Sequence, residues 1–562
     1  MNEQATPLAS ALAPASLDDP LYYLKNLQAV VTWVMTHHHD LLDAEELTTL
    51  QQLLQLSIPA QALLARMIIR KGEIFRSDKL KYDEIPSSAN ALDELSKYRF
   101  IDSNPLIAIE QIHKHCRRDE LLNLLIAAGS ALPKSATKSE LLTALETLDL
   151  ATSASPLHDW WPEAPFSLVS LQCMALFDRL RLMFFGNLHQ DWSEFVLTEL
   201  GHQAYEAVAF DPQFRAFGSR DDVNSYLALH HCQTALQEAS DITTILPLLP
   251  ERLSNSWLEY RRQRLGFQMA QHAERAGDIP LAIELYTGNV LDEAKVRLYR
   301  VLEKYSDDSL AVIHALEQDL QSSLRLETQV HLQRILLRLS RKVGKPQPKP
   351  KKQKLPIVEF SLNNNDQRVE FATLDALTAD DEQEGFYTEN WLFTGLLGLL
   401  LWPALFEPLP GAFFHPFQAG PADLYRPDFV ARRKAQIDER LATLDSGEYR
   451  DLIKHSWQQK YGIACSLVHW PVITEALLDL ALAIIPATHL KTIFTHLLSD
   501  LRNHRRGMPD LCVFDLRLQS YKLVEVKGPG DRLHDHQTLW IESMLAAGIP
   551  IEVAQVQWIT PP

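Results

Sequence analysis

The stretch GMPDLCVFDLRLQSYKLVEVKGPGDRL, residues 507–533, combines two strand-like runs with charged side chains. "PDLCVFDL" and "YKLVEVKG" predict two β-strands, and "RLQS" predicts the turn between them. Side chains of a strand alternate between its faces, so Glu525 and Lys527 project to the same side. Fourteen residues separate Asp510 from Glu525, enough for the chain to run out and return beside its start. We therefore predict that two carboxylates and an ammonium group meet at one end of a sheet.

Such a cluster suits a hard divalent cation. Mg²⁺ prefers oxygen ligands in octahedral geometry and keeps waters that a substrate phosphate can replace. A bound cation polarises the phosphoryl group and lowers the pKa of a bound water, while Lys527 would hold the attacking water and offset charge in the transition state. Pro509-Asp510 with Glu525-Val526-Lys527 is the PD-(D/E)xK nuclease signature. By itself the signature is loose, and an edge hairpin with solvated charges remains the alternative.

The length, net charge and cysteine content of the chain limit the possible domain number, binding partners and cellular compartment. A chain of 562 residues is too long for one hydrophobic core and predicts three or four domains. A net charge of −18 weighs against non-specific binding of nucleic acid, although a local basic cleft acts within a Debye length of about 10 Å. Five scattered cysteines without CxxC spacing indicate reduced thiols in a cytoplasmic compartment and no structural zinc site: Cys116, Cys173, Cys232, Cys465 and Cys512.

Neither the N-terminus nor the interior predicts membrane association. Residues 1–20 lack the basic and apolar regions of a signal peptide. The most apolar run, LFTGLLGLLLWPALF at 392–406, is shorter than the ~20 residues of a membrane span and contains Pro403. It predicts a buried helix.

From about residue 20 to 345 the apolar spacing is helical, so the N-terminal half is predicted to be mostly α. Residues 1–105 form a first helical domain, in which RKGEIFRSDKLKYDEIP (70–86) breaks the pattern and predicts a short β-hairpin or wing. Residues 156–340 form a further helical domain. Within it, FQMAQHAERAGDIPLAIELYTG (267–288) has the small residues of a tetratricopeptide-type helical pair.

Residues 106–155 lie between these domains and read as helix, turn and capped helix. Ser135 or Thr137 caps the second helix, with Glu140 as its capping-box partner. The segment resembles the SAP module, which binds duplex DNA through basic side chains and helix N-termini. A plain αα-hairpin fits equally well. The predicted phosphate contacts are Lys134, Lys138, Arg117 and Arg118, with His115 beside them.

A basic, proline-containing segment, RKVGKPQPKPKKQK at 341–354, predicts an extended hinge between the helical half and the last domain. We expect few contacts across such a boundary, so excising residues 1–340 should leave a nuclease domain, residues 355–562, that folds alone. In this last domain a strand-like PIVEFSLNN is followed by helices, the hairpin of residues 507–533, a helix and a strand. This alternation predicts a mixed α/β domain.

The C-terminal domain resembles the VRR-type nuclease domain of the Fanconi anaemia-associated nuclease family. LVEVKGPGDRL (523–533) followed by HDHQTLWIESMLAAGIPIEVAQV carries the resemblance, which extends from about 385 to 557. It implies a restriction-endonuclease-like fold, with Gln537 on the helix behind the active site. It also makes Glu389, ahead of the GLLLW run, a further metal ligand beside Asp510, Glu525 and the carbonyl of Val526. From spacing alone, Glu389 would be a first-turn acid favoured by the helix dipole.

The resemblance implies a 5′-flap endonuclease and 5′–3′ exonuclease that uses Mg²⁺ or Mn²⁺ and acts on branched DNA in interstrand crosslink repair. A cytoplasmic, nucleoid-associated location would follow in a bacterium. Arg505 and Arg506, just ahead of Asp510 and close to Arg502, are predicted to contact the scissile backbone, with a solvated turn as the alternative. Two alternatives stay open: a junction resolvase or restriction-like endonuclease, which shares the cluster, and a DNA-binding scaffold with a retired nuclease fold.

Overall fold

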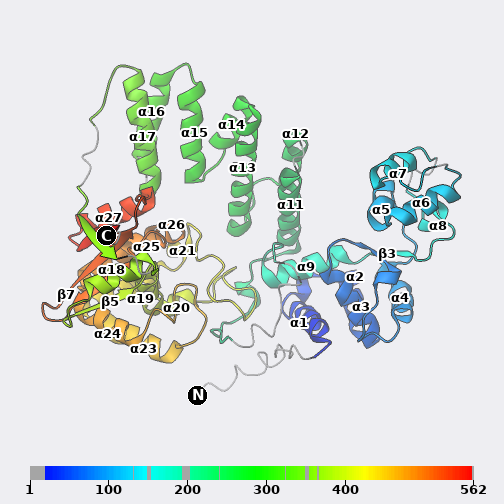
Figure 1. Cartoon of the computed structure of the whole chain (residues 1–562), viewed down its shortest axis with the longest axis horizontal. Helices are drawn as coiled ribbons and strands as arrows, with labels where there is room; N and C mark the ends of the chain where they lie inside the picture. Colours follow the sequence, from blue (N-terminus) through cyan, green and yellow to red (C-terminus); the bar gives the residue numbers. More distant parts are fainter. Residues whose placement is uncertain are drawn as a thin grey trace. The chain divides into compact units, whose positions relative to one another are not determined.

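The computed structural model describes residues 19–130, 132–148, 154–190, 192, 203–238, 241–322, 324–348, 354–363 and 366–559. The chain divides into two compact units. The first contains residues 1–202 and 217–223, and the second contains 203–216 and 224–562. Each unit is described by itself (Figure 1).

The first unit combines helices with a three-stranded sheet of order β1-β3-β2. Its helices are α1 (Tyr22–His37), α2 (Ala44–Gln55), α3 (Ile58–Ile69), α4 (Ser88–Lys97) and α9 (Met174–Phe185), and its strands are β1 (Ile74–Arg76), β2 (Ile101–Asp102) and β3 (Leu168–Leu171). A strand lies where the wing was predicted, but it does not form a local hairpin. It pairs with the fully buried β3 instead, and a 3₁₀ turn at Ser77–Lys79 follows β1 directly.

The segment inserted between β2 and β3 packs around a hydrophobic cluster that also includes Leu168 of β3. It holds α5 (Ile109–His115), α6 (Arg118–Ala127), α7 (Lys138–Leu145) and α8 (Leu157–Trp160). Leucines of α6 and α7 pack into this core. Of the two residues expected to cap α7, Thr137 does so, and its reciprocal bonds with Glu140 form the predicted capping box.

The second unit begins with a succession of helices. They are α11 (Arg220–Gln237, whose first turn lies in the other unit), α12 (Ile242–Ile245), α13 (Ser256–Ala276), α14 (Ile279–Thr287), α15 (Asp292–Tyr305), α16 (Ser309–Leu320) and α17 (Leu326–Lys342). From α13 to α17, consecutive helices pack side by side (Figure 1). Ala270, Ala273 and Ala282 are fully buried, as the small-residue pattern predicts. The small side chains let neighbouring helices approach closely.

The C-terminal part is the predicted mixed α/β domain. Its five-stranded sheet has the order β4-β8-β7-β6-β5. The strands are β4 (Ile357–Asn363), β5 (Gln383–Tyr387), β6 (Leu511–Asp515), β7 (Ser520–Lys527) and β8 (Ile551–Ile559). β8 is parallel to both β4 and β7, whereas β6 is antiparallel to both β5 and β7. The hairpin read from the sequence is therefore confirmed as β6 and β7.

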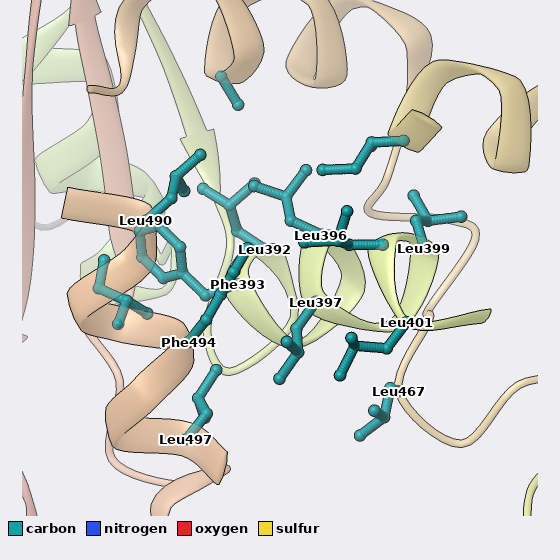
Figure 2. Close-up of a cluster of buried hydrophobic side chains, with 14 of the residues drawn as sticks. Leu392, Phe393, Leu396, Leu397, Leu399, Leu401, Leu467, Leu490, Phe494 and Leu497 are labelled. Carbon is teal, nitrogen blue, oxygen red and sulfur yellow. The ribbon is translucent and has the colours of Figure 1, made fainter. Parts of the chain in front are cut away.

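Helices surround this sheet. They are α18 (Val369–Leu377), α19 (Leu392–Leu400), α20 (Trp402–Leu405), α21 (Phe429–Arg432), α22 (Lys434–Ser446), α23 (Tyr449–Lys460), α24 (Glu475–Ile484), α25 (Ala487–Ser499), α26 (Leu501–His504) and α27 (Asp535–Ala546). Every residue of α19 is buried, which confirms the predicted core helix. Its side chains cluster with Leu467 and with Phe494 of α25 (Figure 2). Gly398 permits this packing, because a Cβ there would lie 2.9 Å from the Cβ of Leu467.

Two ion pairs join the helices before the hinge to the domain after it, and the domain boundary at the hinge stays a prediction. α17 extends to Lys342, and residues 349–353 of the hinge lie outside the described part of the chain. Arg325, which precedes α17, forms a 3.0 Å ion pair with Asp500. Arg334 of α17 approaches Asp535 to 3.3 Å. The composition of residues 341–354 predicts a hydrated segment, but it does not show which side chains before and after that segment contact each other.

The described residues contain no single helix that is both long and apolar enough to cross a membrane. Helices α24 and α25 are long and apolar enough only if they are counted together, and the chain bends by 110° between them.

Candidate active site

Glu525 and Lys527 lie at the C-terminal end of β7, on the same face of the strand. Glu525 is completely buried, and its Oε1 lies 2.6 Å from Nζ of Lys527. The amide Nε2 of Gln537 donates to the same oxygen over 2.5 Å. Gln537 is itself held by the first turn of α27, because its Oε1 accepts the backbone N–H of His534 at 3.0 Å. The helix end therefore orients the amide toward the carboxylate.

Asp510 joins this cluster through the register of the hairpin. Leu511 pairs with Val524, which places the preceding Asp510 beside the last residues of β7. Its Oδ2 accepts the backbone N–H of Val526 at 2.8 Å. Burial, reinforced by the negative charge of Glu525, raises the pKa of Asp510 above its ordinary value. Burial likewise raises the pKa of Glu525.

Glu389 reaches the cluster from the turn between β5 and α19, and not from within the apolar helix. The backbone N–H groups of Thr388 and Glu389 donate to the carbonyl of Asp510 at 2.8 and 3.1 Å. Asn390 turns the chain with a left-handed φ of 61° and accepts the N–H of Met508 at 3.2 Å. These bonds fix Glu389 to the segment that carries Asp510.

Tyr387, which lies outside the nuclease signature, completes the local arrangement. It is the last residue of β5, and its hydroxyl donates to Oε2 of Glu389. Burial and this hydrogen bond raise the pKa of Tyr387 to about 12, so the hydroxyl keeps its proton at neutral pH. The motif offers no signal for it, because β5 lies more than a hundred residues before the hairpin.

The donor set fits a divalent cation. Oε2 of Glu525 is buried without a hydrogen-bond partner among the described residues, an arrangement that costs free energy unless another group satisfies it. The three carboxylates influence one another electrostatically. Among the described residues no three such side chains are already gathered as a preformed metal site. Tyr387 instead engages Glu389, while Lys527 and Gln537 engage Glu525.

A cavity of about 420 Å³ lies next to the cluster, between α17 and the helices α26 and α27. Basic and imidazole side chains dominate its lining, with Glu327 and Asp535 as the acidic members; the positive and imidazole groups are His331, Arg334, His496, Arg502, His504, Arg506 and His536. No residue of the carboxylate cluster lines the cavity, but His536 does, and its pKa is lowered by burial and by nearby charges that include Lys527, so the cavity lies near the cluster. Burial lowers the pKa of His331, His496 and His536, so the charge of the lining comes from three arginines and two carboxylates, and its small positive balance favours an anionic occupant.

The residues predicted to contact DNA occupy different settings. Arg506 is exposed at this cavity, whereas the guanidinium of Arg505 stacks 4.4 Å from the ring centre of Tyr425. In the inserted helices of the first unit, Arg117 and Lys134 are exposed and Lys138 is half-exposed. Arg118 is also exposed, but its guanidinium donates to the carbonyls of Lys134 and Ala136, so it braces the turn before α7.

A second basic run, ARRK at 431–434, is structural. Arg433 is fully buried and forms a two-pronged ion pair with the equally buried Asp423 at 2.9 and 3.0 Å. Its Nε donates to the carbonyl of Ala404. Arg432 contacts the same aspartate. These arginines tie the loop after α20 to the core and are not free for DNA.

Known proteins match this chain over its whole length. A Fanconi-associated nuclease 1 homolog from Pseudomonas aeruginosa is 38% identical over 568 residues, covering 99% of both chains. The chain belongs to the Fanconi-associated nuclease 1 family. A homolog from Arabidopsis thaliana is 24% identical and covers 95% of this chain and 67% of the relative. The crystal structure of paFAN1 bound to 2nt 5'flap DNA with gap matches 98% of this chain and 100% of that chain, with a TM-score of 0.84 and 37% identity.

Two family descriptions agree with this assignment. The VRR-NUC domain matches residues 445–558, and the "FAN1, HTH domain" matches residues 21–102. The resemblance read from the hairpin and α27 is thereby confirmed, as are the helical N-terminal half and the C-terminal nuclease fold. The protein is a nuclease of the Fanconi-associated nuclease 1 family, which implies use of a divalent metal ion. The helix-turn-helix character of the first domain was not predicted, because periodicity alone indicates helices and not their crossing.

Proposed function

We propose that this protein is a structure-selective DNA nuclease, a 5′-flap endonuclease with 5′–3′ exonuclease activity that acts in interstrand crosslink repair. One observation carries the chemistry: Glu525 is fully buried at the end of β7, shared by Lys527 and Gln537, with one oxygen left unsatisfied. The flap preference is supported by the related paFAN1, which was crystallised with 5'flap DNA. A cytoplasmic location, where DNA is accessible in a bacterium, fits this role.

Asp510, Glu525, Glu389 and the carbonyl of Val526 are the proposed ligands of Mg²⁺ or Mn²⁺. Bound there, the cation would act as a Lewis acid on the scissile phosphate. Lys527 would orient the attacking water with its ammonium group and neutralise charge that develops on the phosphate. Gln537 would hold the Glu525 carboxylate in one orientation, because its own amide is fixed by the N-terminus of α27.

Contacts with DNA are proposed at two places. Arg506 and the neighbouring cavity would attract backbone phosphates close to the cluster, and Arg505, stacked on Tyr425, would support that segment. In the inserted helices, Lys134, Lys138 and Arg117 would contact duplex phosphates, while Arg118 shapes the turn that presents them.

A panel of end-labelled substrates tests the proposal. Purified protein is incubated with Mg²⁺ and with 5′-flap, 3′-flap or four-way-junction DNA of matched sequence. We expect the 5′-flap to be cut fastest and the linear duplex to be degraded from its 5′ end. Symmetrical cutting of the four-way junction at a rate equal to that of the flap would instead support the resolvase alternative.

A further inference from the structure

A second cationic group lies at the same end of the sheet as the candidate active site. Arg368 precedes α18, and its Nη2 donates to the hydroxyl of Tyr387 at 3.2 Å. Tyr387 in turn donates to Glu389. Because Tyr387 pairs with Leu511, the residue after Asp510, this chain of hydrogen bonds ends at the carboxylate cluster.

The guanidinium of Arg368 is oriented before any substrate arrives. It lies 5.2 Å from the ring centre of Tyr387 and 5.5 Å from that of Phe371, and the two rings pack 5.3 Å apart. Its Nε faces Glu370 at 3.3 Å. These contacts engage two of the five N–H donors that a guanidinium carries, so the group retains capacity for a further acceptor.

Exposure distinguishes Arg368 from the other cation of the site. The side chain of Lys527 is 11% exposed and is committed to Glu525, whereas the side chain of Arg368 is 58% exposed. A phosphodiester that approaches three carboxylates meets unfavourable charge, and an exposed guanidinium at the rim offsets it. Guanidinium groups bind phosphate through parallel N–H bonds, which suits this role.

We propose that Arg368 binds a phosphate of the DNA backbone next to the scissile bond, and that Tyr387 is a positioning residue that links this contact to Glu389. The inference rests on the proposed nuclease function. Tyr387 holds one oxygen of the Glu389 carboxylate through its hydroxyl and orients the guanidinium through the same oxygen atom. Substrate binding at Arg368 and the placement of Glu389 are therefore coupled through one side chain.

The first test measures binding without cleavage. Affinity for labelled 5′-flap DNA is determined by fluorescence anisotropy in a chelator over a range of salt concentrations. The variants are Arg368→Ala and Arg368→Lys. The matched control is Arg517→Ala, because Arg517 is also an exposed arginine paired with a glutamate, at 3.1 Å from Glu382, but it follows the opposite end of β6.

For Arg368→Ala we expect affinity to fall about tenfold, as for the loss of a hydrogen-bonded charged contact. The slope of log affinity against log salt should become shallower by about 0.9, the value for one phosphate contact. Arg368→Lys keeps the charge and should retain the slope while losing part of the affinity. Arg517→Ala should match the wild type.

The result that overturns the inference is an Arg368→Ala protein with the affinity and salt slope of Arg517→Ala. If the wild type itself fails to bind or cut flap DNA, the proposed function has failed, and the two failures are thereby separated. Tyr387→Phe tests the coupling: calorimetric titration with Mn²⁺ in the absence of DNA should show weaker binding than in the wild type, whereas Arg368→Ala should not. Unchanged Mn²⁺ affinity in Tyr387→Phe would remove Tyr387 from the positioning of Glu389.

Discussion

At the scale of single residues, the cluster assigns a separate task to Lys527. Its ammonium group faces Glu525 and is largely buried, so it is placed to act on the water and the phosphate without being a metal ligand. We expect Lys527→Ala to lower turnover by about 10²-fold or more, in the range of one lost electrostatic stabiliser. Mn²⁺ should still bind in a calorimetric titration. Loss of Mn²⁺ binding together with turnover would contradict this division of roles.

The acid–base behaviour of Asp510 gives a second residue-scale prediction. A carboxyl whose pKa is raised by folding binds a proton more tightly in the folded than in the unfolded state. Its contribution to stability is therefore present at low pH and is lost as pH rises above the ordinary carboxyl range of about 4. In a chelator, the free energy of unfolding should fall from pH 5 to pH 8 more in the wild type than in Asp510→Asn. If the free energy of unfolding depended on pH in the same way in both proteins, folding would not destabilise the ionised form of Asp510.

The residues found from sequence are those whose signal is local. Asp510, Glu525 and Lys527 share one hairpin, so short-range pattern places them together, whereas Gln537 and Glu389 were named only because of the family resemblance. Tyr387 and Asn390 could not be found this way. Their partners are Glu389 beside them and Met508 more than a hundred residues later, and only the pairing of β5 with β6 brings those segments into contact.

At the scale of elements, α19 depends on a close approach that only glycine allows. A Cβ at position 398 would meet Leu467 and the side chain of Val468 at 2.9 and 3.0 Å. We expect Gly398→Ala to destabilise the protein by about 1–3 kcal/mol, the usual cost of overpacking. Gly266→Ala is the control: it lies within α13, where the nearest atom would be 3.5 Å away. That change should stabilise by about 0.5–1 kcal/mol in urea unfolding. Equal effects of the two substitutions would contradict the packing described for α19.

An element could be predicted where its hydrophobic periodicity was clear and its interaction partner lay nearby in the sequence. The β6–β7 hairpin, the core helix α19 and the capping box of α7 all satisfy that condition. The small sheet of the first unit does not, because β1 and β2 both pair with β3, and an inserted helical segment separates β2 from β3. A strand of three residues is too short for its sequence pattern to predict which distant strand it pairs with.

At the scale of the whole molecule, the helices before the hinge belong structurally with the nuclease domain. A fragment of residues 203–562 corresponds to the second unit with its connecting segment and should fold and cut DNA. A fragment of residues 341–562 loses Arg325 and Arg334, and with Arg325 the partner of Asp500, whose side chain is only 6% exposed. We expect the shorter fragment to show a lower Tm and faster limited proteolysis around α26. Equal stability of the two fragments would show that the nuclease domain begins at the hinge and does not need the preceding helices.

We infer that the carboxylates at the end of β7 make the protein a metal-dependent nuclease, and the substitution Glu525→Gln tests this inference most directly. Single-turnover cleavage of end-labelled 5′-flap DNA is measured in Mg²⁺, alongside binding of the same DNA in a chelator. Glutamine keeps the shape of the side chain and removes its charge, so we expect flap affinity within about threefold of the wild type and a cleavage rate at least about 10³-fold lower. A Glu525→Gln protein that binds the flap and cuts it at the rate of the wild type would contradict the claim.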